Sequence, residues 1–251
     1  MVVLTDREPF EYRYLSRRLL ADLFQHDEAT RRRWKFQAAI SAWVGSLQAS
    51  RASLDHTNMH ALAARSEHLV TDNTSSLKKT AAAATYIKDQ LELRHGIFAP
   101  HQGWDGGEVA CYSGEITNEE NERVFLALFG SASNVIGYRS DGGIGYYPSD
   151  IMGLYTMLDL VREPDDPEMD YEFRWDDGHL DAQYRAYAAV KFSHAEVCIP
   201  IGGHDFLARI FLEVSNFRYE DNFTGRVIIG TPLWIATPRP VPQNAHVLGR
   251  S

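Results

Sequence analysis

Apolar and polar residues alternate along several segments of this chain, as they do in half-buried strands. The clearest segment is 86–98, which is apolar on one face and charged or amide-bearing on the other. Asp89 and His95 interrupt its apolar face, which singles them out for closer inspection. The same pattern, or a short apolar run, predicts further strands at 10–15, 34–44, 108–116, 122–130, 205–219 and 225–237.

Apolar residues at helical spacing predict four helices between these strands. Ser16 is placed to cap a helix that runs to about Gln25. The others are expected at 59–70, 150–161 and 180–193. Because strands and helices do not alternate strictly, a doubly wound parallel sheet is disfavoured. We therefore expect an α+β fold, with a largely antiparallel, twisted sheet and about four helices packed on it.

A single α+β domain is expected to span residues 1–242. Its boundary, if it divides in two, is expected in the acidic loop 163–178, and a loose C-terminal tail is expected at 243–251. The apolar faces of the predicted strands are expected to share one core. The residues expected there are Trp34, Phe36, Ile40, Leu91, Leu126, Leu128, Ile210, Leu212, Ile228 and Trp234.

The charge balance limits the partners. A net charge of −9 leaves no broad basic surface for phosphate groups, so we expect no nucleic-acid binding. Acidic residues gather at 162–181, whereas residues 1–51 are basic. Such a loop is typical of a solvated surface, but it could also pair within the molecule or between the subunits of a homo-oligomer.

The cysteine count and the hydropathy indicate the compartment. Cys111 and Cys198 are the only cysteines, so we expect two reduced thiols and a cytoplasmic protein. The sequence has no apolar signal core near residue 1, and no window approaches the roughly 20 apolar residues of a membrane helix. We therefore expect a soluble protein without membrane association.

Two glycine-rich loops carry the main candidates for ligand binding. Loop 99–107 and loop 130–150 each follow a predicted strand, and we expect any ligand site where the two loops meet. Glycines let a backbone approach a ligand closely, and aromatic rings supply flat walls. The alternative is a pair of tight turns with their rings against the core. The candidate residues are His101, Trp104, Asp105, Asn134, Tyr138, Tyr146 and Tyr147.

Other chemistry is less well supported. Loop 130–150 lacks a P-loop lysine, and Asp150 would repel an anion, so a helix cap by Ser149 or Asp150 is the favoured interpretation. A second cluster, with Cys111 as a further member, could ligate a metal, or Cys198 could act as a nucleophile. The apolar neighbours of Cys198 favour burial instead, and we assign no metal, cofactor or catalytic residue. This cluster comprises His194, Cys198, His204 and Asp205.

Four short motifs, at 13–19, 124–131, 147–150 and 230–234, read Arg-Tyr-Leu-Ser-Arg-Arg-Leu, Val-Phe-Leu-Ala-Leu-Phe-Gly-Ser, Tyr-Pro-Ser-Asp and Gly-Thr-Pro-Leu-Trp. In these motifs the chain resembles a family of uncharacterised bacterial proteins that begin with a Tyr-Leu-Ser strand and carry a later Gly-Ser turn. The resemblance implies a place among multi-component or conflict-associated proteins, a binding or regulatory role, and no assigned catalytic residue.

The function expected from the sequence is that of a non-catalytic binding or regulatory module, which contacts a protein partner or holds a small molecule in a pocket. The alternative is a hydrolase or other enzyme. A cluster of histidines that converge in space favours the enzyme, whereas a flat apolar surface favours the module. The residues of the enzyme alternative are His101, Asp105, Cys198 and His204.

Overall fold

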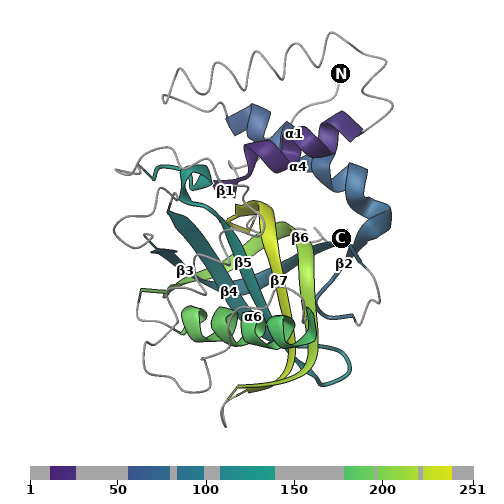
Figure 1. The fold of residues 1–251 in the computed structure, drawn as a ribbon. Coiled ribbons are helices and arrows are strands. Elements are labelled where there is room, and N and C mark those ends of the chain that lie inside the picture. The colour runs from purple at the N-terminus through teal and green to yellow at the C-terminus, as the bar shows by residue number, and fades with distance from the viewer. Residues whose placement is uncertain are drawn as a thin grey trace, which may run out of the picture.

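The strands of the chain form one connected, twisted sheet with helices packed on it (Figure 1). The computed structural model describes residues 12–26, 56–79, 84–98, 108–138, 178–194, 197–219 and 223–238. The strands are β1 (Tyr12–Leu15), β2 (Thr74–Ser75), β3 (Tyr86–Phe98), β4 (Val109–Thr117), β5 (Arg123–Ser131), β6 (Ile199–Tyr219) and β7 (Phe223–Ala236). The helices are α1 (Arg17–His26), α4 (His56–Val70) and α6 (Gly178–Ser193), with short 3-10 turns η1 (Thr71–Asn73) and η2 (Ala132–Asn134).

The expected α+β class and the largely antiparallel sheet are confirmed. The segment 86–98 forms β3 over the expected residues, and helices form near 16–25, 59–70 and 180–193. The described residues therefore hold three α-helices rather than about four. The helix expected at 150–161, the strand expected at 34–44, and most of the 163–178 loop lie outside the described residues, as does the tail 243–251.

The start of β6 differs from the expectation. The strand begins at Ile199 rather than at 205, because the segment that contains Pro200 and Gly202 pairs with β3. Gly202 has φ +87°, a left-handed conformation that glycine adopts readily, next to a shift in the pairing with β3. In a sequence, proline and glycine argue against a strand. Here Pro200 and Gly202 lie at the register shift of the β3–β6 pairing, where a strand tolerates them.

Five strands close into a ring. β3 pairs with β4, β4 with β5, β5 with β7, β7 with β6, and β6 returns to β3. Only the β5–β7 pair of this ring is parallel, while β1 lies beside β7 and β2 beside β3. Around the ring the strands therefore follow one another as β3, β4, β5, β7 and β6, so the last two are exchanged relative to chain order. Five-stranded Greek-key barrels of the OB type share this strand order.

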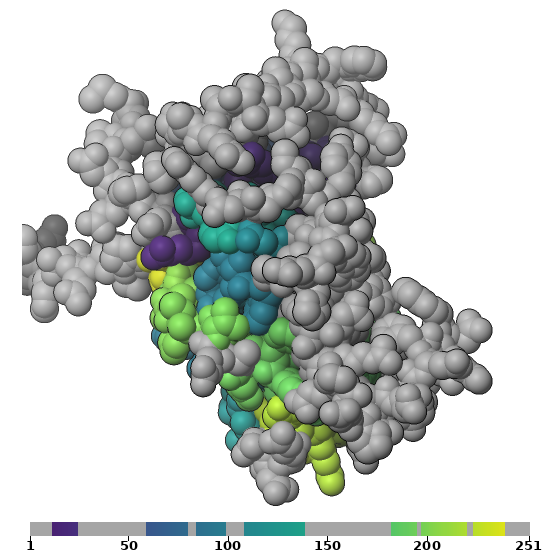
Figure 2. All heavy atoms as spheres, turned by 60° about the vertical axis from the view of Figure 1, so that its left-hand side comes forward, coloured from purple at the N-terminus to yellow at the C-terminus, as the bar shows by residue number. Residues whose placement is uncertain are grey.

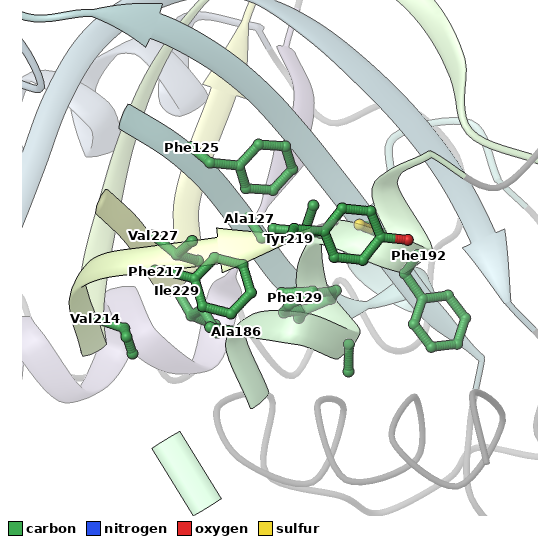
Figure 3. Packing of buried hydrophobic residues seen from close by; sticks show 14 of the residues in the cluster. Phe125, Ala127, Phe129, Ala186, Phe192, Val214, Phe217, Tyr219, Val227 and Ile229 are labelled. Carbon is green, nitrogen blue, oxygen red and sulfur yellow. The ribbon is translucent and has the colours of Figure 1, made fainter. Parts of the chain in front are cut away.

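The buried apolar residues form three clusters rather than one core. The interior cluster draws on all five ring strands and β1, and it includes Leu91, Leu126, Leu128 and Ile228. The second cluster lies between α6 and the outer faces of the strands, as Figure 3 shows. The third lies where α1 and α4 cover β1 and the end of β7.

The expectation of one shared core is therefore wrong in part. Leu212 packs against the α6 cluster and Trp234 belongs to the cluster under α1 and α4, whereas Ile210 packs against the interior. The physical reason is that a register shift lies between Ile210 and Leu212 in β6 and another lies between Pro232 and Trp234 in β7. The extra residue of each bulge moves the residues beyond it to the other face, and here both faces are covered. Trp34, Phe36 and Ile40 lie outside the described residues.

Candidate functional site

The two candidate loops leave the barrel from the same end. In the sheet register, Phe98 at the end of β3 is the partner of Val109, which is in turn the partner of Ser131 at the end of β5. The backbone N–H of Ala132 donates to the carbonyl of Glu108 at 2.9 Å, which ties the bases of the two loops together. We call this the loop end of the barrel.

Two further segments, the start of β6 and β1, meet at the loop end. Ile199, the first residue of β6, pairs with His95 of β3. A single bridge joins Tyr14 of β1 to Val135, and the N–H of Ile136 donates to the carbonyl of Arg13 at 2.9 Å. Figure 2 looks towards this side of the molecule, where the purple N-terminal segment, the teal segment after β5 and the green start of β6 lie around β3.

A buried phenol anchors the loop that follows β5. The Tyr14 side chain is fully buried, and its hydroxyl oxygen accepts a hydrogen bond from the Asn134 amide at 3.2 Å. Gly130 makes room for this ring, because a Cβ atom there would overlap the Tyr14 hydroxyl. Burial raises the pKa of Tyr14 to about 12, against the opposing effect of the Asn134 bond, so the phenol stays neutral.

An imidazole stacks on a second buried phenol. The rings of His95 and Tyr112 lie 4.3 Å apart with 15° between their planes, and Tyr14 meets Tyr112 edge to face at 5.8 Å. His95 donates from Nδ1 to the carbonyl of Cys111 at 3.1 Å. Desolvation lowers the pKa of His95, with a further contribution from the charge of Arg13, so this imidazole is neutral near pH 7.

Two buried polar atoms on strands that line the barrel interior lack a hydrogen-bond partner. His204 is 2% exposed and donates from Nδ1 to the carbonyl of Gly202, which leaves Nε2 without a hydrogen-bond partner. The hydroxyl of Tyr112 is also buried without a partner, and burial raises the pKa of this phenol well above its usual range. An unsatisfied buried polar atom costs about 1–3 kcal/mol, so a bound molecule that satisfies both atoms would recover that free energy.

The structure describes two of the seven predicted ligand residues. Asn134 is the hydrogen-bond donor to Tyr14, and Tyr138 is half-buried against the interior cluster. The other five lie outside the described residues: His101, Trp104, Asp105, Tyr146 and Tyr147. Residues that the sequence did not indicate are Tyr14 and Tyr112, because both occupy ordinary apolar positions in their strands. His95 was recognisable from its break in the apolar pattern.

The second sequence cluster does not converge. Cys198 belongs to the α6 cluster outside the barrel, whereas His204 pairs with Leu91 of the interior cluster and so faces the interior. No group of three or more metal-ligating side chains occurs in the described part of the chain. The expected burial of Cys198 is confirmed, and the enzyme alternative has its two described members on opposite faces of the sheet.

A separate groove lies between α4, β2 and β3, with a volume of about 610 Å³. Two of its charged groups pair with each other, since Lys88 binds Glu67 at 2.5 Å. Its hydroxyls are also committed, since Thr74 donates to the Val70 carbonyl and Ser76 donates to the carboxylate of Asp89. Asp89 also accepts from the N–H of Leu77 at 2.9 Å, so it stabilises the turn after β2. The groove is therefore a weaker candidate than the loop end.

The fold and the loop end define an α+β barrel protein whose interior carries phenol and imidazole groups. The chain belongs to the family of unknown function DUF7019, which matches residues 11–238 and so includes every described element. This match confirms the resemblance to an uncharacterised family. No curated protein and no solved structure matches the chain. None of the described helices is long and apolar enough to cross a membrane.

Proposed function

We propose that this protein is a non-catalytic binding module that takes a small polar ligand at the loop end of the barrel. The observation that carries the proposal is the pair of buried, unpartnered atoms, Tyr112 Oη and His204 Nε2. Ligand sites are mostly apolar, with a few polar groups that fix orientation. Two unpartnered polar atoms within an apolar interior match that description.

The chemistry of these atoms indicates the class of ligand. Tyr112 stays protonated because burial raises its pKa, so its hydroxyl can donate as well as accept. His204 donates from Nδ1, which leaves Nε2 as the acceptor when the ring is neutral. The complementary ligand is a small, uncharged molecule that carries both a hydrogen-bond donor and an acceptor.

The candidate loops complete the proposed site by their connection to the barrel. Both leave from the loop end, so His101, Trp104 and Asp105 on one side, with Tyr146 and Tyr147 on the other, are proposed as ligand contacts. Tyr138 is proposed as a wall residue. Asn134 acts in this proposal by orienting Tyr14, since its amide already donates to that hydroxyl.

Nucleic acid is not proposed as a ligand. The net charge is −9, and OB-type barrels bind oligonucleotides over the strands that correspond to β4 and β5. Here Cys111 of β4 and Phe125 of β5 lie in the cluster covered by α6.

The proposal also includes the remaining expectations from the sequence. These are a cytoplasmic location, a protein partner, homo-oligomer formation and a link to bacterial conflict or multi-component systems.

The test is a thermal-shift screen of the full chain against small, uncharged polar compounds. A compound that binds the loop end raises the melting temperature of the wild type. Tyr112→Phe removes Tyr112 Oη, one of the two unpartnered atoms on which the proposal rests. In this variant the compound should raise the melting temperature much less than in the wild type. Tyr219→Phe is the matched control, because Tyr219 is a buried tyrosine of the α6 cluster, away from the interior. Equal shifts in both variants would reject the site.

A further inference from the structure

The two cysteines of the chain meet beneath α6. Cys111 lies in β4 and Cys198 directly precedes β6, and each thiol is buried and free. Each thiol shifts the pKa of the other, and the hydroxyl of Ser193 at the end of α6 acts on the pKa of Cys111. The chain has only two cysteines, and the fold buries both of them in the same cluster.

Gly96 creates the space in which the thiols meet. It is the direct partner of Cys111 in the β3–β4 ladder, and a Cβ atom at Gly96 would lie 2.8 Å from Sγ of Cys198 and 3.4 Å from its Cα. Cys111 and Cys198 therefore both border the space over Gly96 that a side chain would otherwise fill. A disulfide requires the two Cα atoms to lie within about 7 Å of each other, and mass analysis of the oxidised chain tests this requirement.

The backbone around Cys198 is held in place. The guanidinium of Arg94 donates to the Cys198 carbonyl, which fixes the residue at the start of β6. Its two neighbours in the chain reach the surface, since Val197 is 45% and Ile199 is 60% exposed. A small oxidant therefore has a short path to Cys198, whereas Cys111 lies within β4 under the helix.

We propose that Cys111 and Cys198 are a modification site, at which a peroxide converts the two thiols into a reversible intramolecular disulfide. In the first step the Cys198 sulfur attacks the peroxide; it becomes a sulfenic acid, and the peroxide is reduced to an alcohol or water. In the second step the Cys111 sulfur attacks the sulfenic acid, a sulfur–sulfur bond forms, and one water leaves with the Cys111 proton. A thiol reductant restores the pair.

The division of roles follows from the surroundings of each sulfur. The hydrogen bond from Cys111 lowers the pKa of Cys198, burial opposes this, and the positive charge of Arg94 adds to the lowering. The same contact and its own burial raise the pKa of Cys111. Since the thiolate is the nucleophile, Cys198 is the thiol that meets the oxidant and Cys111 is the one that resolves it. This inference is independent of the proposed ligand site.

The experiment treats the reduced, full-length chain with hydrogen peroxide, alkylates the remaining thiols, and measures intact mass and peptides without reduction. We expect a monomer that has lost two hydrogen atoms, no alkylated cysteine, and full recovery with dithiothreitol. Three results would each overturn the proposal. The first is a mass increase from added oxygen atoms, and the second is a disulfide between two chains. The third is a pair of unmodified thiols under conditions in which the same peroxide oxidises glutathione.

Variants assign the two roles and check the geometry. Cys111→Ser should leave a sulfenic acid on Cys198 that dimedone traps, and Cys198→Ser should leave Cys111 unoxidised. Gly96→Ala should suppress the disulfide by displacing Cys198. Gly203→Ala is its matched control, because a Cβ there meets only the end of the flexible Glu92 side chain and a proline ring. If Gly96→Ala does not fold, the wild-type mass and the two cysteine variants still decide the proposal.

Discussion

The face under α6 and the loop end of the barrel are both buried, but they bury different chemistry. Under α6, the rings of Phe98 and Phe192 meet edge to face at 4.8 Å, and the hydroxyl of Ser193 donates to the Ala189 carbonyl at 2.7 Å. The interior at the loop end holds phenol and imidazole groups, some of which lack partners. One step along β4, from Cys111 to Tyr112, passes from the first environment to the second.

This difference separates stability from function. Apolar rings under α6 lower the free energy of the folded state simply by leaving water. Buried polar atoms without a partner, such as Tyr112 Oη and His204 Nε2, raise it unless another molecule satisfies them. The comparison therefore predicts that substitutions under α6 reduce stability, whereas substitutions at the loop end mainly change binding and pH response.

The largest expected effect tests the apolar face. Phe129→Ala removes a fully buried ring between β5 and α6, which should lower the free energy of unfolding by about 3–5 kcal/mol. Urea unfolding followed by circular dichroism measures the change. Glu119→Ala, on an exposed turn, serves as the control and should stay near the wild type. A loss below about 1 kcal/mol for Phe129→Ala would show that α6 does not pack tightly on the sheet.

The next effect tests the close fit of Tyr14 at the loop end. Gly130→Ala places a methyl group where the Tyr14 hydroxyl lies and should cost about 1–3 kcal/mol. Tyr14→Phe removes that hydroxyl and its bond from Asn134. Combined with Gly130→Ala, it should recover part of the loss. A double-mutant cycle on unfolding free energies measures this coupling. Strictly additive values would mean that the two residues are not in contact.

The smallest effect is a pH dependence. The pKa of His95 is lowered in the folded state, so the unfolded chain takes up this proton first as the pH falls below about 6.5. Stability from the neutral ring is present above that pH and is lost as the pH falls through the folded-state pKa. His95→Gln should flatten this acid-side loss in unfolding experiments between about pH 7 and pH 5. His68→Gln, an exposed site on α4, should keep the wild-type slope. An unchanged slope in His95→Gln would contradict a neutral, half-buried His95 imidazole.

Part of the candidate site could be predicted from the sequence. Asn134 and Tyr138 were indicated by their position in a glycine-rich loop after a strand, and His95 by its break in an apolar face. The actual partner of Asn134 is Tyr14, which is 120 residues away in the chain. No local pattern specifies such a contact, because it depends on where β1 crosses the end of the barrel.

The local elements were determined by the sequence itself. The alternation at 86–98 defines β3, and the helical spacing at 59–70 defines most of α4, because side-chain periodicity depends only on neighbours in the chain. Only the tertiary structure decided three other features. These are the closure of the ring, the parallel contact of β5 with β7, and the meeting of Cys111 with Cys198. These features depend on pairings between distant strands, and the alternating pattern that specifies a buried face does not specify which strand or helix covers it.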